Sequence, residues 1–149
     1  MLRKIMIATD GSETSIHAAE LAIDLAKLSG ATVAAVYVVD ISKLAQLPGY
    51  TSLPGKNDRL MELMFKEGDE AMTEIKNMAS NARVNFEKSV AEGDPSTEIL
   101  KRSEKDGIDL LVMGGIGRSG LEKFLLGSVA EKVVRHSKVP ILIVPGRKG

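Results

Sequence analysis

Short strand-like runs alternate along the chain with longer segments of helical period, and this alternation constrains the fold more than any other feature of the sequence. The runs cover residues 5–8, 31–39, 84–90, 108–113 and 139–144. Strands that are joined by helices run parallel, and a parallel sheet is covered by helices on both faces. The sequence therefore predicts an α/β fold with a doubly wound, five-stranded parallel sheet.

Capping and turn residues separate the strands from the helices. The predicted helices cover residues 12–29, 58–82, 95–105 and 121–136. Asp10 or Ser12 can cap the first of them, and Asp94 with Pro95 supplies a cap and a favoured first residue for the third. Residues 41–57 contain two prolines and two glycines and show no clean period, so they are expected to form a mobile loop.

A glycine-rich segment follows the fourth predicted strand. Glycine lets backbone N–H groups approach phosphate oxygens, and the start of a following helix adds a positive dipole. Gly114, Gly117 and Gly127-Ser128 lie in this segment, and Gly127 falls inside the helical pattern of residues 121–136. Glycine inside a helix costs about 1 kcal/mol relative to alanine. Either Gly127 serves helix packing, or a helix begins at Ser128 and its first amide groups face the same anion as Gly117.

Two common nucleotide motifs are incomplete here. Gly115, Gly117 and Gly120 match GxGxxG, but a dinucleotide site also needs an acidic residue at the end of the next strand. No Asp or Glu follows Glu131, so a nicotinamide or flavin site is disfavoured. The P-loop pattern fails because no glycine of this segment is followed by Lys and then Ser or Thr.

Composition excludes several further classes. Twenty basic residues balance twenty acidic ones, and aromatic residues make up 3% of the chain, which argues against nucleic-acid binding. The chain has no cysteine, so disulfides, thiol catalysis and thiolate metal sites are excluded. No stretch approaches the roughly 20 apolar residues that span a bilayer. We expect a cytoplasmic protein that does not enter membranes.

Carboxylates follow two of the predicted strands, at the edge of the sheet where ligands bind in this class of fold. Asp10 is a candidate for binding ribose hydroxyls, or alternatively a cap, whereas Asp40 is expected to be solvated or to cap. His17 and His136 lie far apart, and neither has a partner at zinc-site spacing. With no nucleophile–base pair in view, we expect no covalent catalysis and no catalytic residues.

The sequence resembles the universal stress proteins, in their ATP-binding branch, over almost its whole length. The segments that carry the resemblance are Ala8-Thr9-Asp10-Gly11-Ser12, Val38-Val39-Asp40 and the spacing Gly114-x2-Gly117-x9-Gly127-Ser128. The resemblance implies one domain over residues 1–149. It also implies strand order 3-2-1-4-5, as in the adenine nucleotide alpha hydrolase-like fold.

The resemblance further implies an ATP site built from eleven residues: Ala8, Thr9, Asp10, Val38, Met113, Gly114, Gly117, Arg118, Gly127, Ser128 and Val129. In that site Asp10 would hold the ribose, the backbone around Val38 would contact the adenine edge, and Met113 would line the pocket. Gly114 would contact the ribose or the α-phosphate, and Arg118 would add positive charge. The phosphates would lie on the backbone of the remaining glycines, Ser128 and Val129. Mg²⁺ or Mn²⁺ would bridge the phosphates.

We expect a nucleotide-dependent stress sensor or regulator that acts through a protein partner and hydrolyses ATP weakly at most. The HxGH pair and the SGGxDS loop of adenylate-forming relatives are absent. Two alternatives stay open: a slow or partner-activated ATPase or phosphotransferase, and an interaction module without nucleotide. The last strand, Val139–Val144, is apolar on both faces, which predicts a homodimer that pairs this edge with its copy.

Overall fold

A parallel five-stranded sheet forms the middle layer of the computed structural model, which describes residues 1–41, 56–115 and 127–146. The strands are β1 (Lys4–Thr9), β2 (Thr32–Asp40), β3 (Phe86–Gly93), β4 (Leu110–Gly114) and β5 (Ile141–Val144). The helices are α1 (Glu13–Ser29), α3 (Lys56–Asn81), α4 (Pro95–Lys105) and α5 (Ser128–His136). The sheet order is β3-β2-β1-β4-β5, which confirms the predicted fold class and strand order.

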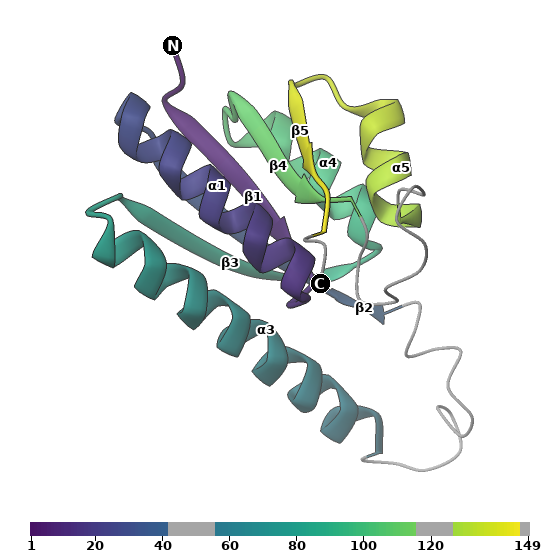
Figure 1. Cartoon of the computed structure of the whole chain (residues 1–149). Helices are drawn as coiled ribbons and strands as arrows, with labels where there is room; N and C mark the ends of the chain where they lie inside the picture. Colours follow the sequence, from purple (N-terminus) through teal and green to yellow (C-terminus); the bar gives the residue numbers. More distant parts are fainter. Residues whose placement is uncertain (42–55, 116–126, 147–149) are drawn as a thin grey trace.

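Helices cover both faces of the sheet (Figure 1). Residues on α1 and α3 pack with one set of strand side chains, including Ile5 and Ile7, and α4 and α5 pack with the other set, including Met6. Alternate residues of β1 therefore enter two separate cores, because successive side chains of a strand point to opposite faces. This explains the near-continuous apolar runs of β1 and β4, which lie inside the sheet and are covered on both faces.

Gly68 brings α3 close to the sheet. A Cβ at this position would lie 2.6 Å from Cδ1 of Tyr37, so any larger residue would displace the ring or the helix. Tyr37 points from β2 into the core beneath α1 and α3 and is 5% exposed. The cost of a glycine inside a helix is offset here by the packing of an aromatic ring against the helix backbone.

Several element boundaries differ from the sequence-based predictions. β3 begins at Phe86 and not at Val84, because the Val84 N–H donates to the Ala79 carbonyl at the end of α3. α3 begins at Lys56, two residues before the predicted start. The rest of the predicted loop, residues 42–55, lies outside the described residues.

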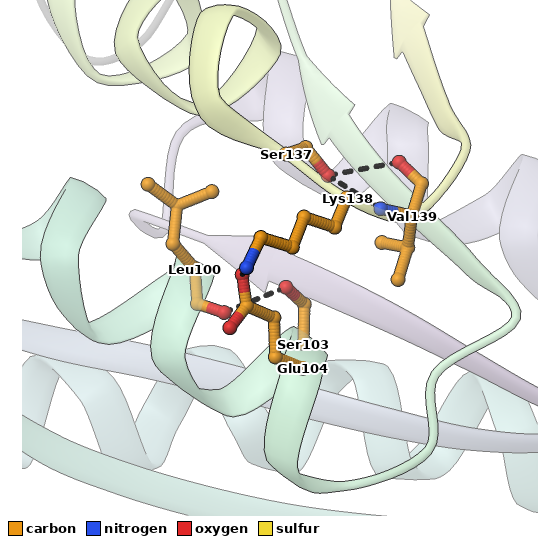
Figure 2. A network of polar contacts seen from close by, with 6 residues as sticks. All are labelled: Leu100, Ser103, Glu104, Ser137, Lys138 and Val139. Carbon is orange, nitrogen blue, oxygen red and sulfur yellow. Dashed lines mark hydrogen bonds and ion pairs between the residues drawn. The ribbon is translucent and has the colours of Figure 1, made fainter.

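The last strand is shorter than predicted, because a local turn holds the residues that precede it. The Ser137 hydroxyl donates to the Val139 carbonyl (2.8 Å) and accepts from the Val139 N–H (3.1 Å), as Figure 2 shows. Pro140 follows and has no N–H to donate to a ladder. β5 therefore begins at Ile141. Beside this turn, Lys138 forms an ion pair with Glu104 on α4 (3.8 Å).

Candidate functional site

A cavity of about 330 Å³ lies at the carboxyl ends of β1, β2 and β4, next to the first turns of α4 and α5. β1 has β2 on one side and β4 on the other, so this is the place where the strand order changes direction. Parallel sheets leave a crevice at such a point. The cavity therefore lies where the fold places a ligand site.

Nine of the eleven residues named from the sequence line this cavity: Ala8, Thr9, Asp10, Val38, Met113, Gly114, Gly127, Ser128 and Val129. They come from four elements and the residues beside them, and folding brings them together from opposite ends of the chain. The other two, Gly117 and Arg118, lie outside the described residues.

Within the described part of the chain, the lining contains nine further residues that the motifs did not identify as site residues: Ser12, Ser15, Val36, Tyr37, Asp40, Met64, Pro95, Ile99 and Ala130. Asp40 lies at the cavity, where the sequence-based expectation was a solvated or capping role. Met64 reaches it from α3. Strand alternation is a signal that identifies Val36, because it lies two residues before Val38 and shares its face.

One wall of the cavity is apolar. Ala8, Val36 and Met113 belong to the core beneath α4 and α5, and Ile99 and Ala130 contribute to the same core from those helices. All five residues are at least nine-tenths buried. A flat apolar ring such as a nucleobase can pack against such a wall without leaving polar groups unpaired.

A second part of the lining is polar and comes from the end of β1 and the turn that joins it to α1. The Ser15 hydroxyl donates to the Ser12 carbonyl (2.9 Å), so Thr9 must donate the hydrogen of the Thr9–Ser15 hydroxyl pair (2.8 Å). The Thr9 hydroxyl also accepts from the Gly11 N–H (3.1 Å). Because both hydroxyl hydrogens are used, the remaining capacity of this buried pair is to accept hydrogen bonds. This polar wall complements hydroxyl or N–H donors of a ligand.

Asp10 combines a turn role with a place in the cavity. Its Oδ1 accepts from the Ser12 N–H (2.9 Å), which closes an Asx turn. The cap of α1 is Ser12, whose hydroxyl accepts from the Ser15 N–H (3.2 Å). Of the two caps that the sequence allowed, the structure uses Ser12, and Asp10 lines the cavity beside it.

α5 begins at Ser128, with Gly127 as its N-cap. This confirms the alternative in which a helix starts at Ser128. The first N–H groups of a helix have no acceptor within it, and Gly127 has no side chain that could accept from them. The Gly127 N–H itself donates to the Gly115 carbonyl (2.7 Å), which ties this helix start to the end of β4. Gly127, Ser128, Val129 and Ala130 line the cavity, so the positive end of the helix dipole faces it.

α4 also begins at the cavity, but its cap is a carboxylate. Oδ2 of Asp94 accepts from the Thr97 hydroxyl (2.8 Å), the Ser96 hydroxyl (2.8 Å) and the Thr97 N–H (3.1 Å). The hydrogen bond from the Thr97 side chain, followed by that from Ser96, lowers the pKa of Asp94 from its ordinary value. The carboxylate form is therefore favoured at this helix start.

The described residues contain no group of three His, Cys, Asp or Glu side chains that could hold a metal ion. The carboxylates on the described part of the lining are those of Asp10 and Asp40. Across residues 1–41, 56–115 and 127–146, no helix is both long enough and apolar enough to cross a membrane.

Comparison with known proteins agrees with the fold. Residues 1–145 match the model of the universal stress protein family. Universal stress protein MJ0531 of Methanocaldococcus jannaschii is 43% identical over 144 residues, which cover 97% of this chain and 82% of the relative. The solved structure of MJ0577 from the same organism superposes with a TM-score of 0.84 at 29% identity, covering 100% of this chain and 99% of that one.

A universal stress protein solved in complex with cAMP superposes with a TM-score of 0.69 at 26% identity, covering 98% of each chain. The fold and the cavity define a doubly wound α/β protein with a cavity at its topological switch point. The chain belongs to the universal stress protein family.

Proposed function

We propose that the cavity binds an adenine nucleotide, ATP in particular, and that the protein acts as a nucleotide-dependent stress sensor or regulator through a protein partner. The observation that carries the proposal is the start of α5, a helix N-terminus without a side-chain cap that faces a cavity with an apolar wall. The cAMP complex of a family member at 26% identity supports an adenine nucleotide as the ligand class.

The two walls of the cavity orient the nucleotide in this proposal. Adenine packs against the apolar wall of Ala8, Val36 and Met113, with its edge at the backbone of Val38. The ribose hydroxyls are donors, so they face the polar wall and the Asp10 carboxylate. The ribose then joins a base and a phosphate group that need opposite environments.

The phosphates lie at the start of α5 in this proposal, on the backbone of Gly127, Ser128 and Val129, with Gly117 and Arg118 contributing from the glycine-rich segment. A Mg²⁺ or Mn²⁺ ion accompanies them. Since no metal cluster occurs among the described residues, we infer that the ion bridges phosphate oxygens and water. Its chemistry would be to neutralise phosphate charge.

A regulator is favoured over an ATPase by the composition of the lining. Its described part contains no His, Lys, Arg or Cys, and the hydroxyls of Thr9 and Ser15 donate within the protein. The carboxylates of the described lining are those of Asp10, which this proposal assigns to the ribose, and Asp40; the remaining described residues supply no general base for attack by water. A partner-activated ATPase or phosphotransferase remains the second candidate, because a partner can supply a missing catalytic group.

Mass spectrometry of nucleotide released from the purified protein tests the proposal. Bound ATP that persists during incubation supports a nucleotide-dependent regulator. ADP that accumulates with time supports the ATPase alternative. Protein that releases no nucleotide, and whose calorimetric titration with ATP and Mg²⁺ shows no heat of binding, contradicts the proposed site and favours the interaction module.

We also propose a homodimer through β5. The edge strand β3 carries Glu87, Lys88 and Ser89, and ion pairs to Lys4 and Asp69 engage the two charged residues. The other edge, β5, reads Ile-Leu-Ile-Val, and its first three residues are only partly buried. An apolar edge is prone to pairing, and a second copy would cover it and satisfy its backbone groups.

Light scattering at micromolar concentration tests this interface. We expect a dimeric mass for the natural chain and a monomeric mass for Ile143→Pro, because proline removes a backbone donor from the strand. The control Ile143→Val keeps the backbone and should remain dimeric. A monomeric natural chain contradicts the interface, and so does a folded Ile143→Pro variant that stays dimeric.

A further inference from the structure

We propose that Thr14 is a positioning residue for the ligand cavity. Its side chain fixes the first turn of α1 against the ends of β4 and β5, and thereby sets where Asp10 and Ser12 lie. The inference about the ligand rests on the proposed function, whereas the packing of Thr14 is independent of it.

Two glycines surround Thr14. A Cβ on Gly114, the last residue of β4, would lie 2.8 Å from Cγ2 of Thr14 and 3.2 Å from the Ser15 backbone nitrogen. A Cβ on Gly146, two residues after β5, would lie 3.2 Å from Oγ1 of Thr14. Neither glycine has a left-handed φ angle, so their backbone conformations do not require glycine. The space that Thr14 occupies explains both residues.

Hydrogen bonds connect the residues on either side of Thr14 with residues that line the cavity. Thr14 lies between Ser12 and Ser15, which are joined by the cap bond from the Ser15 N–H to the Ser12 hydroxyl. The Ser12 N–H in turn donates to Asp10, and the Ser15 hydroxyl contacts that of Thr9. Thr14 itself is not part of the cavity lining. A displacement of Thr14 would move the whole polar wall, while the apolar wall beneath α4 and α5 would stay in place.

Contact with Thr14 explains the glycine at position 114 in a different way from the family resemblance, which implies contact with a ribose or phosphate. If glycine is needed there for close approach of a ribose or phosphate, the identity of residue 14 is irrelevant. If glycine is needed because of the Thr14 side chain, removal of the Thr14 methyl group relieves the shortest contact of a methyl group at position 114 (2.8 Å) and leaves the contacts with the Thr14–Ser15 backbone (3.2 Å). Thr14→Ser removes only Cγ2 and keeps the hydroxyl, so it separates the two explanations.

The experiment is a double-mutant cycle of Gly114→Ala, Thr14→Ser and the double variant, with ATP and 2′,3′-dideoxy-ATP titrated by calorimetry. We expect Gly114→Ala to weaken ATP binding by roughly tenfold, and the double variant to recover to within about threefold of the natural chain. Gly114→Ala should also reduce the preference for ATP over the dideoxy analogue, which a general loss of stability would leave unchanged. Thr73→Ser, the same chemical change on the exposed face of α3, should alter neither quantity.

Two results would overturn the inference: a double variant as weak as Gly114→Ala, or a Gly114→Ala variant that binds as the natural chain does. Thermal unfolding without ligand keeps the inference separable from the proposed function. Gly114→Ala should lower Tm, and the Thr14→Ser change should restore part of the loss. A natural chain that binds no ATP but shows this recovery contradicts the proposed function and supports the packing role of Thr14. Additive losses of Tm in the double variant contradict that role.

Discussion

α4 and α5 pack against each other and begin at the same cavity, but their first turns are completed in different ways. Asp94 caps α4 with three hydrogen bonds from the residues that follow it. Gly127 caps α5 and has no side chain to accept any. At the start of α4, Pro95 has no N–H and the Thr97 N–H is paired with a carboxylate, whereas no side chain caps the first N–H groups of α5.

Under the proposed function, a single residue at each helix start separates a cap that stabilises the helix from a start that binds a ligand. The Asp94 carboxylate occupies the position that an anion would take, and its lowered pKa keeps it charged. At α5 the same favourable interaction with the dipole is available to a phosphate group. Three sets of substitutions and a change of pH alter one helix start or the groups beside it, and we take them from the largest expected effect to the smallest.

Gly127→Asp gives α5 the type of cap that α4 has. The φ and ψ angles of Gly127 (−59° and 154°) suit any residue, so the change introduces no backbone strain. We expect ATP affinity to fall by about 2.7 kcal/mol, roughly a hundredfold, because a carboxylate would replace and repel the phosphates. Isothermal titration calorimetry measures the loss, and thermal unfolding should show a Tm that is unchanged or raised.

Two further variants at this position separate charge from bulk. Gly127→Val adds bulk without charge and should cost at least ~1.4 kcal/mol of ATP affinity while the circular-dichroism spectrum stays native. Gly127→Asn, a neutral match for Asp, should weaken binding less than Asp does. A folded Gly127→Asp variant with the affinity of the natural chain would rule out the start of α5 as the phosphate site.

Asp10→Ala tests the other end of the proposed nucleotide. A carboxylate that accepts hydrogen bonds from ribose hydroxyls should contribute roughly 1.5–3 kcal/mol to ATP affinity. The loss should be much smaller for 2′,3′-dideoxy-ATP, because that analogue lacks both hydroxyls. Calorimetry with the two nucleotides decides the matter. Equal losses would indicate that Asp10 acts through its turn or through a metal ion.

Asp94→Ala opens the start of α4. Loss of the N-cap should reduce the free energy of unfolding by about 1 kcal/mol, as measured by denaturant titration. ATP affinity should stay within about threefold of the natural value, because this end carries no proposed phosphate contact. An affinity loss as large as that of Gly127→Asp would show that the two helix starts do not differ in function.

Acidification should produce the smallest effect. Because the pKa of Asp94 is lowered in the folded chain, its contribution to stability is fully present above the unfolded pKa of about 3.9 and is lost as pH falls through the folded pKa. Asp94 is exposed, so solvent screening keeps the effect small. Denaturant titrations of the natural chain and of Asp94→Asn between neutral pH and pH 3 should show a stability difference that narrows on acidification. A stability difference that does not change with pH would show that the charge of Asp94 does not contribute to the α4 cap.

Local patterns were enough to predict the type of most elements. Apolar runs, helical periods and caps reflect interactions between residues that are close in the chain, so the parallel sheet and its covering helices followed from them. The predictions were wrong at element boundaries, where one or two hydrogen bonds determine the residue at which a strand begins. The bond from the Val84 N–H to the Ala79 carbonyl delays the start of β3, and the turn at Ser137 delays the start of β5.

The sequence by itself determined the cavity-lining residues at the carboxyl ends of strands, because parallel strands must bring these ends to one edge of the sheet. Asp10 and Gly114 are of this kind, and their motif spacing is visible in the chain. Only the tertiary structure decided which helix faces complete the cavity: Met64 from α3 and Ile99 from α4 reach it by packing, and no local pattern encodes that contact. It also showed that Gly114 is next to Thr14, a residue 100 positions earlier, because β1 and β4 are neighbours only once the sheet has formed.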